Sequence, residues 1–469
     1  MAIPKRMKFS LATLLVQAVF IILYVIFVDY EDAADPTKPK AASPIPTYYP
    51  MYQDIHVMIF VGFGFLYTFL QRYGYSGAGY NILLGAVAVQ WTLIIRALFF
   101  HELASGGRVQ MSLTELITGD FNAATVLISF GALIGKTGPL QLLVMVILEV
   151  VFANLNEYIG TEHLKVSDVG GSMFIHAFGA YFGLAVSRVL YKEPHESSSN
   201  LRAGYLSDIF ALIGTIFLWC FWPSFNGGLA SEDGRLRAVI NTVASLVACV
   251  VVTMAISSLL SRRGNFEISH LQNASLAGGV AVGTCANMPI KPWGAMVLGT
   301  IAALVSTLGY KYGSDFLAAK MKVHDPAGIN NLHGMPGVLA AIAGAAMAAL
   351  ATKDNFGDSL YDIFPARTPS IINGTVYAED RTAMEQGGYQ IAALVTTMTV
   401  AIVGGLLTGL VMRLPIWDAP EENDLYNDRD YWDISEHGFP SDPTGLQATS
   451  SNSTGGLLRS ADNAGYDGI

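Results

Sequence analysis

Charged residues are scarce in this sequence. Lys, Arg, Asp and Glu together make up 14% of its 469 residues, whereas a soluble globular domain usually contains about 25%. Intrinsic disorder does not explain the deficit, because 24 Phe, 21 Tyr and many long aliphatic runs are atypical of disordered chains. The composition therefore excludes a disordered scaffold and argues against a cytosolic enzyme.

Cysteine is equally scarce. The three cysteines, Cys220, Cys249 and Cys285, all lie inside apolar runs, and an odd number of cysteines cannot pair completely. No disulfide framework is expected.

Basic residues are outnumbered by acidic ones, 27 to 37, which gives a net charge of −10. Most of the excess lies in the tail, since acids outnumber Arg by 11 to 2 from Asp418 onward. The rest of the chain is nearly neutral and has no basic patch of the kind that binds nucleic acid. We therefore expect no nucleic-acid partner.

The sequence instead contains many apolar runs, and a helix needs roughly 20 apolar residues to cross a bilayer. Twelve candidate runs precede the tail: residues 9–28, 51–70, 80–100, 121–135, 140–158, 168–190, 205–225, 238–260, 268–286, 293–310, 324–352 and 389–412. They predict an all-α polytopic membrane protein with about twelve transmembrane helices in a lipid bilayer.

The first run follows Lys5, Arg6 and Lys8 and has two interpretations. It is longer than a usual signal-peptide core, and no small-residue cleavage site precedes the acidic segment after Val28. We therefore favour an uncleaved anchor that forms, with the first outer loop, residues 1–50. A signal peptide is the alternative.

The distribution of basic residues predicts the orientation. With a cytoplasmic N-terminus, the even-numbered loops, both termini and Arg188 at the end of its run collect 16 of the 27 Lys and Arg, as the positive-inside rule predicts. Residues 353–413 then comprise an outer loop and the last helix, and residues 414–469 an acidic cytoplasmic tail. The outer loop contains Asn373-Gly-Thr, which makes Asn373 the candidate glycosylation site.

Two segments resemble each other. Asp168 and Asp325 are each followed by Gly after three residues and by His, His176 or His333, after eight. Residues 52–55 and 205–209 form a second, similar pair that opens two other runs. Chance matching is the alternative for either pair alone.

These pairs predict two five-helix repeats, residues 51–190 and 205–352. An odd number of spans in each repeat gives the halves opposite orientations, as in many transporters whose site lies between inverted repeats near the midplane. We therefore expect the repeats to surround a central pore.

His176 and His333 are the strongest candidate functional residues, because an ionisable group inside an apolar helix is costly. Repeat symmetry would bring them together near the midplane, where two neutral rings can share a proton. Hydrogen bonding between helices is the alternative role. For His56, His270 and His324, which lie near the ends of runs, packing is the expected role.

A metal or nucleotide site is not expected. The two histidines have no third Asp, Glu or Cys at ligand spacing, and no convincing phosphate-binding loop is present. We therefore predict no metal, no cofactor and no enzymatic activity.

Four carboxylates, Asp54, Asp168, Asp208 and Asp325, lie at the starts of predicted helices. Capping of free backbone N–H groups is their expected role, and a carboxylate at a pore mouth can also attract cations. Glu149 lies deep in a run without an obvious partner and has no assigned role.

The sequence resembles the Rh glycoproteins, the animal branch of the ammonium transporter superfamily. The resemblance covers nearly all spans and is carried by residues 170–184 and 328–337, which are similar to the two twin-histidine segments of that family, and by residues 222–226 and 272–284. It implies a twelve-span protomer, a pore through each subunit of a homotrimer, and a place in the plasma membrane.

The resemblance also implies roles for individual residues. It places Phe121 and Phe225 at the outer gate, Glu157 in the outer vestibule and Asp168 as a structural acid beside the pore. We group Asp208 and Asp325 with these vestibule and structural acids, and expect Leu184, Ser172 and Asn226 next to the pore. Leu184 is expected where electrogenic relatives carry a tryptophan over the outer ammonium site.

The implied function is passive conduction of ammonia, with ammonium deprotonated in the outer vestibule and ammonia crossing along His176 and His333. Carbon dioxide is a further expected permeant. A non-conducting scaffold that recruits cytoskeletal or sorting partners through its tail is the alternative, and Tyr431-Trp-Asp-Ile434 resembles a sorting signal. An intramembrane enzyme is a third hypothesis and would need turnover that depends on the histidines.

Overall fold

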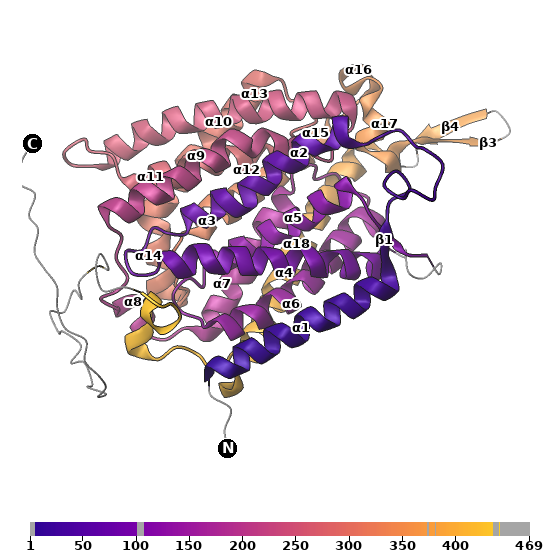
Figure 1. The fold of residues 1–469 in the computed structure, drawn as a ribbon. Coiled ribbons are helices and arrows are strands. Elements are labelled where there is room, and N and C mark those ends of the chain that lie inside the picture. Colours follow the sequence, from indigo (N-terminus) through magenta and orange to yellow (C-terminus); the bar gives the residue numbers. More distant parts are fainter. Residues whose placement is uncertain (1–4, 101–106, 373–374, 380, 435–439, 441–469) are drawn as a thin grey trace, which may run out of the picture.

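The structure is a computed structural model that describes residues 5–100, 107–372, 375–379, 381–434 and 440. It is a bundle of long helices that run roughly side by side (Figure 1). All twelve apolar runs are helical, so the prediction of an all-α polytopic architecture is confirmed.

The first six spans are formed by α1 (Lys5–Phe27), α2 (Ile45–Val57) continued by η1 (Met58–Gly62) and α3 (Phe63–Leu66), α4 (Gly74–Phe99), α5 (Leu113–Gly131), α6 (Pro139–Tyr158) continued by η2 (Ile159–His163), and η3 (Ser172–Ala177) continued by α7 (Phe178–Leu190). The fourth predicted run, residues 121–135, begins and ends too late, since the helix that forms this span is α5. α5 begins eight residues before Phe121 because the Ser112 hydroxyl accepts the Glu115 N–H and caps the helix.

After the short α8 (Pro194–Ser197), the remaining spans are formed by α9 (Tyr205–Gly227), α10 (Glu232–Leu260), α11 (Ile268–Gln272) with η4 (Ala274–Leu276) and α12 (Ala277–Gly283), α13 (Pro292–Leu308) continued by η5 (Gly309–Gly313), α14 (Ser314–Phe316) and η6 (Leu317–Met321), η7 (Asn330–Gly334) with α15 (Met335–Ala349), and α18 (Ala383–Met412). The loop before α18 holds α16 (Lys353–Phe356), α17 (Ser359–Ile363) and η8 (Pro365–Arg367). The ninth predicted run is broken at Asn273, whose backbone is not helical.

Short strands were not predicted. β1 (Val28–Tyr30) pairs in parallel with β2 (Val109–Met111), and β3 (Pro369–Ile372) pairs antiparallel with β4 (Thr375–Glu379). Both pairs lie at one end of the bundle, which we call the hairpin end, whereas α1 begins and α18 ends at the opposite end (Figure 1). The glycosylation candidate Asn373 lies outside the described residues.

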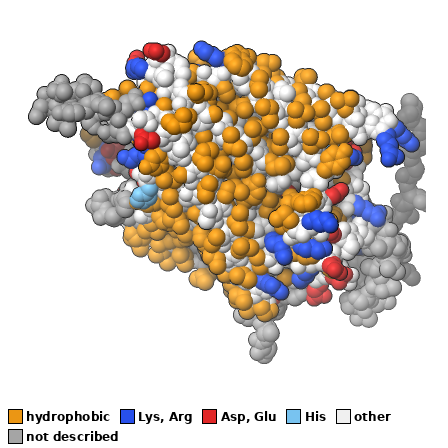
Figure 2. Space-filling view, turned by 180° about the vertical axis from the view of Figure 1, so that it is seen from behind, with side chains coloured by type: hydrophobic (Ala, Val, Ile, Leu, Met, Phe, Trp, Pro, Cys, Tyr) orange, Lys and Arg blue, Asp and Glu red, His pale blue; other side chains and the backbone are white. Residues whose placement is uncertain are grey.

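The outer surface suits a bilayer. Among the described residues, nine helices are long and apolar enough to cross a membrane. Figure 2 shows a broad hydrophobic surface with Lys, Arg, Asp and Glu gathered toward its two ends. Because lipid tails cannot hydrogen-bond backbone groups, a bundle of helices with such a belt is a stable way to span a membrane.

The two predicted repeats share local backbone features. Gly171 and Gly328, each three residues after its Asp, have φ of +66° and +70°, a left-handed conformation that glycine adopts without steric cost. Each is followed by a π-helical turn, η3 or η7, that carries a histidine. π-Helical turns are rare and are frequent at functional sites.

The chain after α18 folds back onto the end of the bundle opposite the hairpin. We call residues 415–434 the strap; it contains η9 (Pro415–Trp417), η10 (Glu422–Asp424) and η11 (Asp428–Asp430). The Asp428 carboxylate accepts the N–H groups of Tyr75 and Ser76 at 2.9 and 2.8 Å and so caps α4. The Tyr426 hydroxyl donates to the His195 carbonyl at 2.8 Å. The first half of the predicted tail is therefore part of the fold.

Candidate functional site

His176 and His333 meet in the interior of the bundle, each from its own repeat. Their Nδ1 atoms are 3.1 Å apart, and their rings are stacked with an interplanar angle of 4°. Both side chains are buried, with 1% and 2% exposure. Because one Nδ1 must donate for this contact to be a hydrogen bond, two neutral rings of opposite tautomers satisfy the geometry.

Asp168 positions the first histidine. One of its oxygens, Oδ2, accepts the N–H groups of Met173 and Phe174, both at 2.9 Å, and Oδ1 accepts the Thr284 hydroxyl at 2.6 Å. The carboxylate therefore holds the first turn of the segment that carries His176 and ties it to the second repeat.

Asp325 has the equivalent role in the other half. Its two oxygens accept the N–H groups of Ile329 and Asn330, both at 3.0 Å, at the start of the turn that carries His333. η7 begins only after this cap, which is why the helix starts later than the predicted run at residue 324.

Aromatic rings form a continuous series next to the histidines. The ring centroids of Phe121 and Phe225 are 4.6 Å apart, and those of Phe225 and His176 are 5.5 Å apart. On the other side of the pair, Phe63 stacks on His333 at 6.1 Å. The structure thus brings the two predicted gate residues together beside the histidine pair.

A cavity of about 360 Å³ opens on the hairpin side of Phe121. Its walls include Phe121, Asn122, Glu157 and Asp168. Glu157 accepts a hydrogen bond from the Arg96 guanidinium at 2.8 Å. We call this cavity the vestibule; Glu157 lines it as half of an ion pair.

Ser172 and Asn226 are buried beside the pair and join elements. The Ser172 hydroxyl donates to the Val280 carbonyl at 2.7 Å and accepts the Thr284 N–H at 2.8 Å. The Asn226 amide donates to the Thr242 hydroxyl and to the Gly279 carbonyl. Both residues lie next to the site and bind η3 and α9 to α12.

Two candidate residues lie away from the vestibule. Leu184 lies on α7 about two turns beyond His176, toward Ser187. Among the described residues that line the vestibule, Leu184 is absent. Asp208 lies at the start of α9, at the end of the bundle opposite the vestibule, and its carboxylate and carbonyl oxygens are near the Gln272 amide.

Several polar contacts were missed because their partners are distant in sequence. His56 Nδ1 lies 3.0 Å from the carboxylate of the buried Asp120, the residue before Phe121. The Ser224 hydroxyl, next to Phe225, donates to Asp54 at 2.5 Å. Both contacts lie next to the gate residues. The only sequence signal for them was the position of each acid among apolar residues.

A polar cluster lies at the strap end of the site. The Lys136 ammonium donates to the Ser187 hydroxyl at 2.8 Å and to the His324 carbonyl at 2.7 Å. Burial lowers the pKa of Lys136 to about 7. Burial and the neighbouring Lys136 charge lower the pKa of His324 to about 2. Since His324 precedes Asp325, this cluster fixes the backbone that leads to His333.

In the part of the chain that the structure describes, no group of three or more His, Cys, Asp or Glu could hold a metal ion. The site instead offers two imidazoles between aromatic rings, with a vestibule on one side. Such an arrangement can pass a small neutral molecule that donates and accepts hydrogen bonds.

Comparisons with known proteins agree with this geometry. Residues 12–431 match the Ammonium Transporter Family. The chain is 47% identical to "Ammonium transporter Rh type B" of Bos taurus, covering 92% of this chain and 95% of that protein. It is 43% identical to "Ammonium transporter Rh type C" of Pan troglodytes, covering 94% and 93%.

Solved structures share the fold. One described as "Nitrosomonas europaea Rh50 and mechanism of conduction by Rhesus protein family of channels" matches with a TM-score of 0.68 and 28% identity, covering 84% of this chain and 93% of that one. Saccharomyces cerevisiae Mep2 matches with a TM-score of 0.62 and 18% identity, covering 79% and 86%, which supports the fold alone.

Proposed function

The chain belongs to the ammonium transporter family as an Rh-type protein, and we propose that it conducts ammonia along His176 and His333. Ammonium or ammonia is the permeant of this family. The histidine pair is the observation that carries the proposal, because its buried Nδ1 contact of 3.1 Å joins the two halves of the chain at one point.

Charge decides which form of the permeant crosses. Moving an unpaired cation into an apolar passage is prohibitive, while a neutral molecule loses only modest hydration. Ammonium therefore leaves its proton with water on the vestibule side of Phe121 and Phe225, which lie between the vestibule and the histidines. Ammonia crosses and is reprotonated beyond the pair, so net flux is passive and follows the ammonia gradient.

The histidine tautomers suit ammonia. In a neutral pair, the ring that donates from Nδ1 leaves its Nε2 free to accept, and the other ring carries its proton on Nε2. His176 Nε2 is buried without a hydrogen-bond partner in the described structure. The pair thus presents one acceptor and one donor, and ammonia can both donate and accept.

Further properties follow from membership in the family. We propose a homotrimer in the plasma membrane with both termini cytoplasmic, which places the strap inside and the hairpin end outside. Asn373 is then the glycosylation candidate on the outer side. Carbon dioxide is a second candidate permeant, because an apolar passage does not reject a small neutral gas.

The test is flux in liposomes that contain a pH-sensitive dye. An ammonium chloride gradient is imposed on wild type, His176→Ala/His333→Ala, His270→Ala and empty vesicles. His270 is also buried but bonds to Ser257, so its variant controls for the loss of a buried histidine. Fast internal alkalinisation with wild type and His270→Ala, and only the background rate with the double variant, is expected.

Equal rates in all four samples, with insertion verified, would contradict conduction. That outcome would favour the alternative, a non-conducting scaffold that binds cytoskeletal or sorting partners through its tail.

A further inference from the structure

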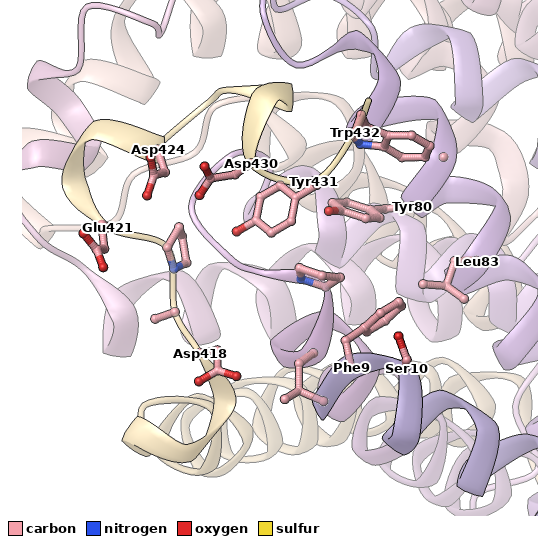
Figure 3. A pocket seen from close by; sticks show the side chains of 15 residues that line it. Phe9, Ser10, Tyr80, Leu83, Asp418, Glu421, Asp424, Asp430, Tyr431 and Trp432 are labelled. Atoms are coloured by element: carbon pink, nitrogen blue, oxygen red, sulfur yellow. The ribbon is translucent and has the colours of Figure 1, made fainter. Parts of the chain in front are cut away.

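A cavity separate from the histidine site lies under the strap. Its volume is about 600 Å³, within the range of small-molecule sites. Phe9 of α1, Tyr80 and Leu83 of α4 and Leu140 of α6 form its walls, and the strap covers it (Figure 3). It is therefore built from three membrane helices and the chain that follows the last one.

The cavity is polarised. The strap contributes Asp418, Glu421, Asp424 and Asp430 to its lining. In Figure 3, Asp418, Glu421 and Asp424 stand toward one side, while Tyr80, Leu83 and Trp432 stand toward the other. Asp418 on one side and the aromatic rings on the other favour a ligand with a positive charge at one end and an apolar or aromatic body at the other.

One carboxylate is only half satisfied. Lys8 pairs with Asp418 Oδ1 at 2.7 Å. The other oxygen, Asp418 Oδ2, is buried and has no hydrogen-bond partner in the described structure. A buried acceptor left without a donor costs about 1–3 kcal/mol. A hydrogen-bond donor from a bound molecule would remove this cost, since the described chain supplies none.

Tyr80 provides an independent indication of a ligand. Its side chain is only 6% exposed, and its hydroxyl has no hydrogen-bond partner among the described residues. The hydroxyl points into the cavity (Figure 3). Its ring lies 6.1 Å from Tyr431 and 6.2 Å from Trp432, centroid to centroid. The Tyr80 side chain is therefore packed between aromatic rings.

The carboxylates do not converge on a metal ion. In the part of the chain that the structure describes, no three His, Cys, Asp or Glu side chains are grouped closely enough to hold one. Cations that prefer oxygen ligands need several of them around one point. The spread of the acids along the strap therefore favours an organic cation.

We propose that this cavity binds an organic amine whose ammonium group donates to Asp418 and whose apolar body packs between Tyr80, Trp432 and Leu83. A primary ammonium can donate one N–H to Asp418 Oδ2 on the acidic side of the cavity, while the Tyr80 hydroxyl, on the aromatic side, faces the body of the ligand. Binding would also connect α1 and α4 to the strap. This site does not depend on conduction through the histidine pair.

The probe is 2-phenylethylammonium, added to the purified full-length protein in lipid nanodiscs and followed by isothermal titration calorimetry. Saturable binding is expected, at least tenfold tighter than for the neutral analogue 2-phenylethanol. Asp418→Asn should weaken binding at least tenfold, and Tyr80→Phe, which removes the hydroxyl that faces the ligand, should weaken it as well. Asp358→Asn, which changes an exposed acid in the loop before α18, is the matched control and should bind as wild type does.

Two further arms identify the source of the ammonium and separate the two sites. Nanodiscs that contain an ethanolamine lipid test the membrane source: a weaker apparent affinity assigns the site to a lipid headgroup, and an unchanged affinity to a free amine. His176→Ala/His333→Ala should bind the probe as wild type does. Absence of saturable binding, equal binding of the neutral analogue, or binding unaffected by both cavity variants would overturn the proposal.

Discussion

Asp168 and Asp325 cap equivalent turns in the two halves, but with different use of their oxygens. In Asp168 a single oxygen accepts both backbone N–H groups, whereas Asp325 uses one oxygen for each. The second oxygen of Asp168 accepts the Thr284 hydroxyl, which can rotate.

This difference predicts unequal tolerance of asparagine. In Asp168→Asn the amide oxygen can keep both N–H bonds while the amide nitrogen donates to Thr284. In Asp325→Asn the amide nitrogen must face an N–H group, which leaves a buried donor unsatisfied at a cost of about 1–3 kcal/mol.

Thermal unfolding of the purified variants in one detergent measures the difference. Asp325→Asn is expected to lower Tm clearly more than Asp168→Asn and to reduce ammonia flux with it. Equal losses would mean that the negative charge, rather than the bonding pattern, holds both turns.

Sequence alone predicted the fold well because most spans are long and apolar. The paired histidines were also predictable, since the Asp, Gly and His spacings repeat. The boundaries that failed were those set by caps, as at Ser112 and Asp325.

Other features of the site depend on contacts between distant segments. His56 and Asp120 are 64 positions apart, and the strap meets α4 across more than 350 positions. No local pattern encodes such pairs. Leu184 and Asp208 lie away from the vestibule, and membership in an apolar helix does not tell which end of the bundle a residue faces.

Phe121 and Phe225 should respond differently to truncation. Phe225 is fully buried between Phe121, Trp222 and His176, whereas Phe121 faces the vestibule. Phe225→Ala is expected to cost about 3–5 kcal/mol and to reduce the yield of folded protein. Phe121→Ala should fold and widen an apolar constriction, which admits water.

The measurement is current across planar bilayers in an ammonium gradient. Phe121→Ala is expected to add an ionic current that wild type lacks, while Phe121→Leu, which keeps the constriction apolar and nearly filled, should not. If Phe121→Ala carries no ionic current, the histidine pair alone is sufficient to exclude ions.

Lys136 predicts a pH dependence of stability. Burial lowers its pKa from 10.5 to about 7 in the folded protein. Between these two values the unfolded chain binds more protons than the folded one, so the free energy of unfolding rises with pH across this window. Lys136→Met should flatten the rise in Tm between pH 7 and pH 10, and Lys320→Met, an exposed lysine on η6, should leave it unchanged. A rise that persists in Lys136→Met would assign the dependence to another group.

Glu149 is fully buried in the middle of α6. The Ser129 hydroxyl lies 2.5 Å from Glu149 Oε1 and 2.7 Å from the Gly179 carbonyl oxygen. A hydroxyl has one hydrogen and cannot donate to both. The Gly179 carbonyl oxygen can only accept, so Ser129 must be the donor in that contact. The contact between Ser129 and Glu149 then requires a proton on the Glu149 carboxyl.

Glutamine supplies the same donor, so Glu149→Gln should keep wild-type Tm and flux, because its amide donates to Ser129. Glu149→Ala removes the donor and leaves a void, and should cost about 2–4 kcal/mol. Infrared spectra should show a protonated carboxyl that disappears in Glu149→Gln but persists in Glu157→Gln, since Glu157 is paired with Arg96. If Glu149→Gln proves as unstable as Glu149→Ala, the buried carboxyl is ionised and Ser129 donates to it instead, which would leave Gly179 to find another donor.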